Sequence, residues 1–216
     1  LPGKNIKDLN GKPLIVHSIE VALASRLIDR VVVSTDDQNI ARISEDNGAD
    51  IPYLRPADIS GDNATDQEYL RHAIGWFKQN NEDYDVVVLL RPTNLFRTAG
   101  DIDEGIKKLL SSDFDSIRGI SPVSYPPYWM KKKEEDRLVS FIDSEFEYSR
   151  RQSLPETFQA NGAVDILRSQ VIMNHKNIYG EYIGYIEMDE KSRTDIDNEL
   201  DFLIADFLHK NLSEKK

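Results

Sequence analysis

Two carboxylates, Asp195 and Asp197, lie two residues apart in the segment RTDIDNELDFLIADFLHK, close to where apolar residues begin to recur at helical spacing. They come after a strand-like stretch, IGYIEMD. Mg²⁺ keeps most of its water ligands in proteins and prefers one or two carboxylates together with substrate phosphates. The pair therefore predicts a site for a metal–nucleotide complex at the edge of a sheet. Glu199 and Asp201 fall past the turn, so we expect them to be solvated.

The same acids have a second interpretation that involves no ligand. The apolar residues of this segment predict a helix that begins near Asp197 and buries one stripe. That stripe consists of Ile196, Leu200, Leu203, Ile204, Phe207 and Leu208. Thr194 is placed to cap such a helix, and acids near its start would stabilise it by ~0.3–1 kcal/mol each. Taken alone, capping explains the pair at least as well as a metal does.

The composition limits which partners such a site could serve. With 216 residues the chain is long enough for one main domain and an appendage. Its formal net charge of −11, from 38 acidic and 27 basic residues, disfavours nucleic acid, since phosphate neutralisation needs clustered Lys and Arg. The absence of cysteine excludes disulfides and thiolate metal sites. No apolar run approaches the ~20 residues of a membrane span. We expect a cytoplasmic protein with no membrane partner.

The elements that must position the site alternate along the chain. Apolar, largely β-branched runs at residues 31–33 and 86–90 are typical of strands buried on both faces of a parallel sheet. Amphipathic helices are predicted at 13–26, with Pro13 as the first helical residue, and at 38–47, 65–79 and 101–110. GAVDILR and IGYIEMD are short strands. The alternation predicts an α/β fold with a doubly wound sheet, whose ligands lie beyond the carboxyl ends of the strands.

The alternation breaks between residues 124 and 159. This segment contains several prolines, a charged turn and four aromatic residues, Trp129, Phe141, Phe146 and Tyr148. It is interpreted as a hairpin-like excursion whose rings need a cover, and a second subunit would supply it. We therefore divide the chain into an α/β domain, residues 1–123 and 160–216, and a dimerisation arm, residues 124–159.

Six segments resemble, in order and spacing, the CMP-sialic acid synthetases, which are the acylneuraminate cytidylyltransferases. They are LPGKNIKDLNGKPL, VVVSTDD, LRPADISGDNATD, LLRPTNLFRTAGDID, RRQSLPETFQANGAVDI and DIDNELDFLIA. The similarity runs from Leu1 to about Phe207. It implies a Rossmann-like, mainly parallel α/β domain with a small dimerisation arm, and a homodimer. It also implies a reaction in which the anomeric hydroxyl of a nine-carbon 2-keto acid sugar attacks the α-phosphate of CTP. The products are a CMP-sugar and pyrophosphate, and Mg²⁺ is required.

The resemblance also implies roles for particular residues. Asp195 and Asp197 would hold Mg²⁺, and Asp197 and Arg151 would be catalytic. The nucleotide-binding residues would be Lys4, Asn5, Arg55 and Asp66. The sugar-binding residues would be Arg91, Thr93, Arg97, Gln152 and Asn161, because the sugar carboxylate suits a bidentate arginine. Without the resemblance, Asn5 would be a turn residue, and each arginine is as readily a surface ion pair.

Two features depart from the family. Arg91 occupies a position of the LLxPT motif where many members have glutamine, which leaves the exact sugar open. Members also begin with a strand and a loop of the type Ala-Arg-x-Gly-Ser-Lys that wraps the triphosphate, and this sequence starts just after it. Because such a loop supplies N–H donors and positive charge to phosphates, we expect catalysis to require an upstream strand and loop.

Two other functions stay open. A Kdo-type cytidylyltransferase would share the chemistry, although RRQSLP and DIDNELD look more like the acylneuraminate branch. A non-catalytic nucleotide-binding dimerisation module belongs to a different class, and it would have no need of the acidic pair. For an enzyme of the acylneuraminate type, neuraminic, legionaminic and pseudaminic acids are all candidate substrates.

Overall fold

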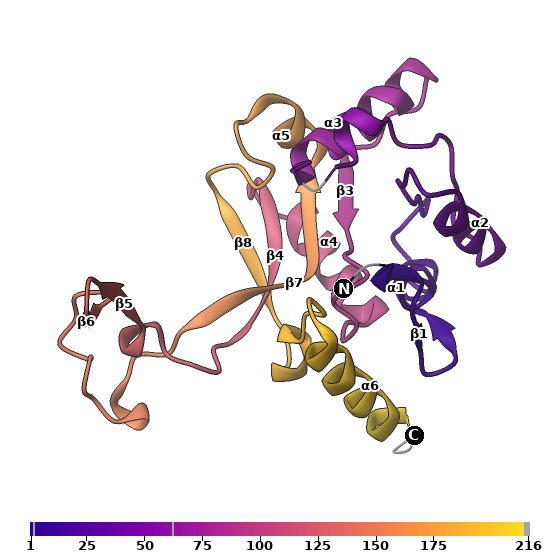
Figure 1. The fold of residues 1–216 in the computed structure, drawn as a ribbon. Coiled ribbons are helices and arrows are strands. Elements are labelled where there is room, and N and C mark those ends of the chain that lie inside the picture. Colours follow the sequence, from indigo (N-terminus) through magenta and orange to yellow (C-terminus); the bar gives the residue numbers. More distant parts are fainter. Residues whose placement is uncertain (2, 62, 214–216) are drawn as a thin grey trace.

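The fold is built around one mixed sheet (Figure 1). It comes from a computed structural model that describes residues 1, 3–61 and 63–213. The strands lie in the order β3–β7–β4–β8, and their bounds are Val86–Leu89 for β3, Phe158–Arg168 for β7, Ser116–Pro122 for β4 and Ile183–Glu187 for β8. β7 runs antiparallel to β3 and β4, whereas β4 and β8 are parallel. Three of these strands therefore share one direction, and the predicted α/β fold is confirmed.

Helices cover both faces of this sheet because its strands are apolar on both sides. α4, Ala99–Leu110, buries Ile102 and Ile106 against Ile166 of β7 on one face. α3, Asp66–Gln79, and α5, Ser169–Asn174, bury a second cluster on the other face, around Leu167. Successive strand residues point to opposite faces, so β7 contributes Ile166 to one cluster and Leu167 to the other. The run at 86–90 forms a strand, as predicted, but β3 is half-buried at the edge of the sheet and pairs antiparallel with β7, so the predicted burial on both faces of a parallel sheet is not found.

The run at residues 31–33 does not become a strand of this sheet. Its backbone forms one isolated parallel bridge, Val32 to Asp50, with hydrogen bonds from Val33 N to Asp50 O (3.0 Å) and from Asp50 N to Val31 O (2.8 Å). The other edge of the run faces a cavity instead of a strand. The prediction of a buried strand here is wrong for this structure, because the run lacks a neighbour on that side.

The predicted helices form, with small shifts at their ends. α1 spans Leu14–Leu23, so Pro13 is its N-cap and not its first residue, and the helix stops before the predicted end. α2, Gln38–Asp46, is followed by Gly48 at φ 90°, a left-handed conformation suited to glycine after a helix. α3 and α4 begin with capping boxes at Thr65 and Thr98. None of the helices in the described part of the chain has the length and apolar character needed to cross a bilayer.

The last helix, α6, spans Glu199–Ser213 and begins two residues later than predicted. Ile196 is fully buried in the loop before it, and Phe202 and Ala205 are the helix residues that turn inward. The stripe expected to be buried is mostly exposed. Leu200, Leu203, Ile204 and Phe207 are 64%, 58%, 45% and 66% exposed. The prediction failed because the anchor, Ile196, precedes the helix, so the helix presents a different face to the body.

α6 packs beside a small N-terminal hairpin, made of β1, Asp8–Leu9, and β2, Lys12–Pro13, that follows the short helix η1, Lys4–Ile6. The contact contains two histidines, with the rings of His17 and His209 4.9 Å apart. The Asn10 amide donates to His209 Nδ1 at 3.0 Å, and His17 Nε2 donates to the Leu9 carbonyl at 3.0 Å. Burial, and then the nearby His17, hold the pKa of His209 below its usual 6.5.

This geometry predicts that acid weakens the fold. The unfolded chain takes up a proton on His209 near pH 6.5, whereas the folded chain does so only at a lower pH. The free energy of unfolding is therefore largest above pH 6.5 and falls as the pH drops from there through the lower folded pKa. Urea unfolding at about pH 8 and pH 5.5 measures this loss in the wild type and in His209→Gln, which cannot be protonated. Equal losses in the two proteins would contradict the assignment.

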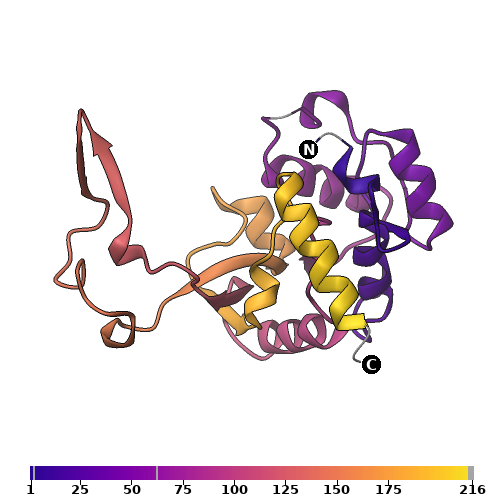
Figure 2. The same ribbon diagram turned by 60° about the horizontal axis from the view of Figure 1, so that its bottom comes forward.

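The excursion is an arm that projects from the body in both views (Figures 1 and 2). It contains an antiparallel hairpin of β5, Lys131–Glu134, and β6, Arg137–Ser140, flanked by the short helices η3, Pro127–Trp129, and η4, Arg151–Ser153. Because β7 begins at Phe158, residues 158–159 belong to the sheet, and the arm comprises 123–157. Residues 214–216, assigned to the α/β domain, lie outside the described residues.

Candidate active site

The predicted site residues gather along one edge of the sheet, where β3, β4 and β8 end. Arg91 and Thr93 follow β3, and the arm that carries Arg151 leaves after β4. Asp195 and Asp197 lie between the short helix η5, Glu190–Arg193, which follows β8, and α6. Ligands of open α/β sheets bind at this edge.

The acidic pair is held by the residue between its two members. Ile196 is fully buried and donates its N–H to the Thr93 carbonyl at 3.2 Å, while Asp195 and Asp197 on either side are exposed. Lys4 Nζ donates to the Ile196 carbonyl at 2.7 Å and to Asp197 Oδ1 at 3.1 Å. The structure thus brings together three residues that lie far apart in the sequence, Lys4, Thr93 and Asp197.

The start of α6 is capped by other residues. Asn198 Oδ1 accepts from the N–H groups of Leu200 and Asp201 at 2.9 and 3.0 Å. Asp201 Oδ2 accepts from the N–H groups of Asp197 and Asn198 at 3.0 and 3.1 Å. Asp201 is therefore a capping residue, whereas Glu199 is exposed as expected and pairs with Lys7 at 2.8 Å. The carboxylates of Asp195 and Asp197 are not needed to cap the helix.

These two carboxylates fit a hydrated magnesium ion. Among the described residues no group of three or more His, Cys, Asp or Glu side chains forms a closed metal cage. A cation at Asp195 and Asp197 would therefore complete its shell with water and phosphate oxygens, as Mg²⁺ commonly does. The side chain of Asp197 is 74% exposed, which leaves room for those ligands, and its one ion pair within the described chain is with Lys4.

A second group of predicted residues lines one end of a cavity of about 770 Å³, which we name the central cavity. It lies between residues 31–35 and 86–92. Asn5, Arg55 and Arg91 lie at the end beyond β3, the polar mouth. The Arg55 guanidinium lies over the Tyr69 ring, 5.3 Å from its centroid, and 3.8 Å from Asp36.

The polar mouth contains a buried donor that the protein itself does not satisfy. Arg55 Nε is buried and has no hydrogen-bond partner within the described part of the chain, whereas the hydroxyls of Ser34 and Tyr53 are buried beside each other. All three residues line the central cavity. Buried polar groups are normally paired, so the free Arg55 donor indicates a place for a polar ligand.

Arg91 is tied into a network of charges that sequence reasoning missed. Its guanidinium donates to Asp165 Oδ2 at 2.7 Å and to Asp66 Oδ2 at 2.5 Å. Asp165 is fully buried and also accepts from Arg118 Nε at 3.1 Å and Tyr179 Oη at 3.1 Å. The one available signal was an aspartate inside the apolar run GAVDILR, where a charge needs buried partners. Arg91 and Asp66 are thus partners of each other in this structure.

Arg97 and Asn161 lie inside the protein. Arg97 Nη1 donates to the carbonyls of Arg91 and Ala163, both at 3.0 Å, and burial lowers the pKa of Arg97 to about 9. Asn161 is 5% exposed, accepts from Ala163 N at 3.0 Å and donates to Ser121 Oγ at 3.0 Å. These contacts brace the loop after β3 against β7. This placement argues against a direct sugar contact by either residue.

Arg151 and Gln152 lie apart from the central cavity. They begin η4 at the base of the arm, both are exposed, and Arg151 Nη2 donates to the Ser124 carbonyl. Neither lines the central cavity. The structure places them at the same sheet edge as the acidic pair, on the side toward the arm and away from the central cavity.

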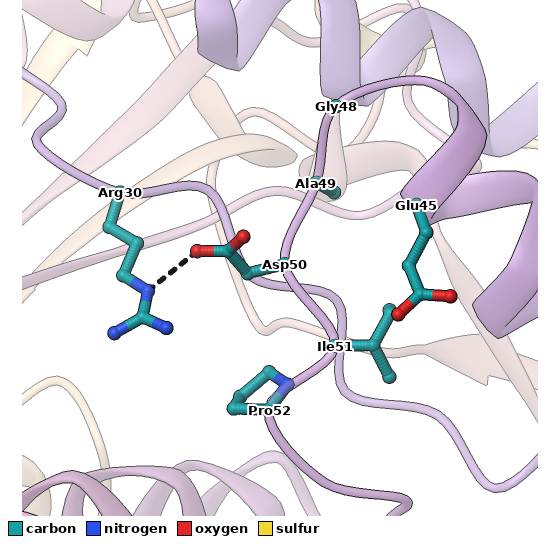
Figure 3. A pocket seen from close by; sticks show the side chains of 7 residues that line it. All are labelled: Arg30, Glu45, Gly48, Ala49, Asp50, Ile51 and Pro52. Atoms are coloured by element: carbon teal, nitrogen blue, oxygen red, sulfur yellow. Dashed lines mark hydrogen bonds and ion pairs between the residues drawn. The ribbon is translucent and has the colours of Figure 1, made fainter.

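A second hollow, of about 450 Å³, lies near the amino end of the run at 31–33 (Figure 3). Its lining comprises Arg30, Glu45, Gly48, Ala49, Asp50, Ile51 and Pro52. Figure 3 shows Arg30 joined to Asp50, with Nε to Oδ2 at 2.7 Å. It contains none of the predicted site residues, and its one arginine is already paired.

The sequence is similar to known proteins over nearly its whole length. Residues 1–208 match the family described as Cytidylyltransferase. The chain is 31% identical to the N-acylneuraminate cytidylyltransferase of Escherichia coli O18:K1:H7, covering all of this chain and 50% of that protein. It is also 31% identical to the CMP-N,N'-diacetyllegionaminic acid synthase of Legionella pneumophila, covering 96% of this chain and 90% of that protein.

Among solved structures, CMP:2-keto-3-deoxy-manno-octonic acid synthetase complexed with CTP superposes with a TM-score of 0.73. It has 17% identity and covers 98% of this chain and 93% of that one. The match shows the same fold, and together with the relatives it defines an α/β nucleotidyltransferase. The chain belongs to the cytidylyltransferase family and, within it, to the CMP-sialic acid synthetases.

Proposed function

We propose that the protein transfers CMP from CTP to the anomeric hydroxyl of a nine-carbon 2-keto acid sugar, an N-acylneuraminate or a related nonulosonic acid, and releases pyrophosphate. The observation that carries this proposal is the acidic pair. Asn198 and Asp201 cap α6, so Asp195 and Asp197 are left exposed at the sheet edge beside Lys4. A cation there would stand between the protein and a triphosphate. The names of the relatives, which include N-acylneuraminate and legionaminic acid enzymes, support the substrate class.

Each group of site residues would have a role that is compatible with its contacts and exposure. Asn5 and Arg55 would receive the cytidine part at the polar mouth, where the buried Arg55 Nε has no partner among the described residues. Asp195 and Asp197 would hold Mg²⁺, which when bound neutralises the triphosphate. Lys4 would turn from Asp197 to a phosphate oxygen once the cation takes its place. Little covalent chemistry falls to the protein in such transfers, so positioning and charge neutralisation are its main contributions.

The acidic sugar would be received on the arm side of the same edge. Arg151 and Gln152 are exposed there, and Arg151 can offer a fork of donors to a carboxylate. Thr93 lies between the two halves of the site, because its carbonyl holds Ile196.

The test is pyrophosphate release from CTP and Mg²⁺ with a panel of sugars, namely N-acetylneuraminic, legionaminic and pseudaminic acids and Kdo. Both the chain and a version extended at Leu1 by a strand and Gly/Ser loop from a relative should be assayed, with mass detection of the CMP-sugar. We expect turnover with at least one nine-carbon acid in the extended protein. Turnover with Kdo alone would favour the Kdo-type alternative. CTP binding without turnover on any sugar would favour the non-catalytic module.

Arg91→Gln is predicted to change sugar preference more than nucleotide use. Arg91 bridges Asp66 and Asp165, and glutamine would release Asp66 while Arg118 still neutralises Asp165. We expect the ratio of kcat/KM values between two acid sugars to shift by about tenfold, a change of ~1.4 kcal/mol in relative transition-state stabilisation, with a smaller change in KM for CTP. Equal losses on every sugar would assign Arg91 to the fold or the phosphates.

We also propose that the protein is a homodimer joined through the arm. Leu138, Phe141 and Tyr148 are 72%, 63% and 89% exposed, whereas Trp129 and Phe146 are half-buried against other arm aromatics. Exposed aromatic residues of this kind are enriched in interfaces. Light scattering at micromolar concentration should show a dimer. Replacing Leu138, Phe141 and Tyr148 by serine should give a monomer with unchanged circular dichroism. A monomeric wild type would refute the arm interface.

A further inference from the structure

One arginine of the charge network, Arg118, has hydrogen-bond donors that no other described residue uses. Its Nε donates to Asp165 Oδ1 at 3.1 Å, while the second oxygen of that buried carboxylate accepts from Arg91. Neither Nη1 nor Nη2 of Arg118 donates to a group within the described part of the chain, and the side chain is partly exposed. Arg118 therefore offers a planar pair of N–H donors to a ligand.

The guanidinium of Arg118 is held in place from two sides. Its central carbon lies 3.8 Å from the centroid of the Tyr179 ring, which is a close cation–π contact. The Tyr179 hydroxyl donates to Asp165 at 3.1 Å, so the ring and the carboxylate that hold Arg118 are also joined to each other. Because the side chain is already ordered, it loses little conformational entropy when its free donors bind a ligand.

Arg118 lies between the polar mouth and the arm. It is on β4, in register with Asp165 of β7 and Tyr185 of β8, so these three side chains share one face of the sheet. β8 is the outermost strand on this side, and Tyr185 is exposed (Figure 1). β4 ends at Pro122, where the arm begins. On the other side of Asp165, Arg91 lines the polar mouth.

The charges around Arg118 indicate what kind of group it would bind. Arg91 and Arg118 are already balanced by two carboxylates, those of Asp165 and Asp66. A carboxylate from a ligand would leave this partly buried group with an excess negative charge, whereas a neutral oxygen would not. A carbonyl oxygen has two lone pairs and can accept from both Nη groups.

The aromatic rings beside Arg118 narrow the choice further. Tyr179 packs against the guanidinium, and Tyr185 lies next to it on the neighbouring strand. Both rings provide apolar surface for a small alkyl group attached to the carbonyl. An acylamino substituent combines a carbonyl oxygen with such an alkyl group and carries no charge. The arrangement therefore suits an acylamino group better than a carboxylate or a phosphate.

We propose that Arg118 is a specificity-determining residue, which donates Nη1 and Nη2 to the carbonyl oxygen of an acylamino group on the acid sugar. The inference rests on the proposed function and adds the group by which the protein would distinguish acylamino sugars from acid sugars without one, such as Kdo. Arg118 lies outside the six segments that resemble the family, so the resemblance assigns it no role. Asp165 and Tyr179 would act as positioning residues for it.

The first test compares sugars with and without an acylamino group. N-acetylneuraminic acid has one, and its deaminated analogue has a hydroxyl in that place. In the active version of the chain, we expect the wild type to prefer the acylamino sugar. Arg118→Lys should lower the ratio of the two kcat/KM values by about tenfold without changing KM for CTP. Lysine keeps the positive charge beside Asp165 but has a single nitrogen, which that carboxylate would hold.

Arg168 provides a matched control on β7. Its Nε and Nη2 donate to three carbonyls, those of Phe114, Leu109 and Ser112, so its role is structural. Arg168→Lys should therefore lower Tm and leave the ratio of kcat/KM values unchanged. An unchanged ratio in Arg118→Lys, or an equal fall in both variants, would overturn the proposal.

A second measurement needs binding but no turnover. Saturation-transfer NMR would be recorded on N-acetylneuraminic and N,N'-diacetyllegionaminic acids, with CTP and no divalent cation. The acetyl methyl group should receive the strongest saturation in the wild type and in Arg168→Lys, and a weaker one in Arg118→Lys. This pattern in a protein that turns over no sugar would count against the proposed reaction and still support the role of Arg118. The same pattern in all three proteins, or no binding of either sugar to the wild type, would overturn the inference.

Discussion

Asp197→Ala is expected to lower kcat by about 100-fold or more while the protein stays folded. A lost metal ligand removes preorganised charge neutralisation from the transition state, and losses of ~10²–10³ in kcat are typical for one such group. The fold should persist because Asp197 contributes one exposed ion pair, to Lys4, and its carboxylate caps nothing. The measurements are steady-state turnover, a Mg²⁺ titration and urea unfolding, made in whichever version of the chain is active.

Two neighbouring acids provide matched controls. Glu199→Ala breaks the ion pair with Lys7 and should leave both kcat and the Mg²⁺ dependence unchanged. Asp201→Ala removes a cap of two N–H groups, so it should cost about 1 kcal/mol of stability without a loss of kcat comparable to that of Asp197→Ala. Wild-type turnover in Asp197→Ala, or an equal loss in Glu199→Ala, would refute the metal assignment.

Asp165→Ala is expected to destabilise the fold by about 3 kcal/mol. Asp165 is fully buried and receives both Arg91 and Arg118, and removing one partner of a buried ion pair commonly costs ~3–5 kcal/mol, because the remaining charge is left uncompensated. We place the effect at the lower end because both arginine side chains are 26% exposed and can be partly solvated. Urea unfolding measures the loss.

Conservative variants separate charge from shape at this position. Asp165→Asn keeps the size and one carbonyl acceptor but not the charge, so we expect a loss smaller than that of the alanine variant. Asp66 is the other carboxylate that pairs with Arg91, and its side chain is 36% exposed. Asp66→Asn should therefore lower the free energy of unfolding by no more than about 1 kcal/mol. A loss below about 1 kcal/mol in Asp165→Ala would show that Asp165 is not the centre of the network.

Properties that depend on near neighbours could be predicted from the sequence. The helix at 65–79 has its cap residue, Thr65, at the start of an apolar pattern, and the structure places α3 there with that cap. The strand at 86–90 and the glycine after α2 were also predicted from the sequence, because local composition and backbone preference are enough to indicate them. The break in the alternation of strands and helices predicted the end of the arm at residue 159, within two residues of the point where the chain re-enters the sheet as β7.

Two questions about the site needed the tertiary structure. Four acids lie within seven residues at the start of α6, and spacing alone could not say which of them caps the helix. The path of the chain decided this, because Ile196 is anchored by Thr93 and shifts the helix start to Glu199. Arg91 meets Asp165 across 74 residues of sequence, and Lys4 meets Asp197 across 193.

The sequence by itself therefore determined the alternating elements, the family and the acidic pair, because patterns and motifs are carried by residues close together along the chain. The tertiary structure alone decided that Arg97 and Asn161 are interior, that Asp165 neutralises Arg91, and that the valines at 31–33 face a cavity instead of a strand. The physical reason is that burial and ion pairing are set by which distant segments meet. A β-run pairs only where another edge is within hydrogen-bonding reach.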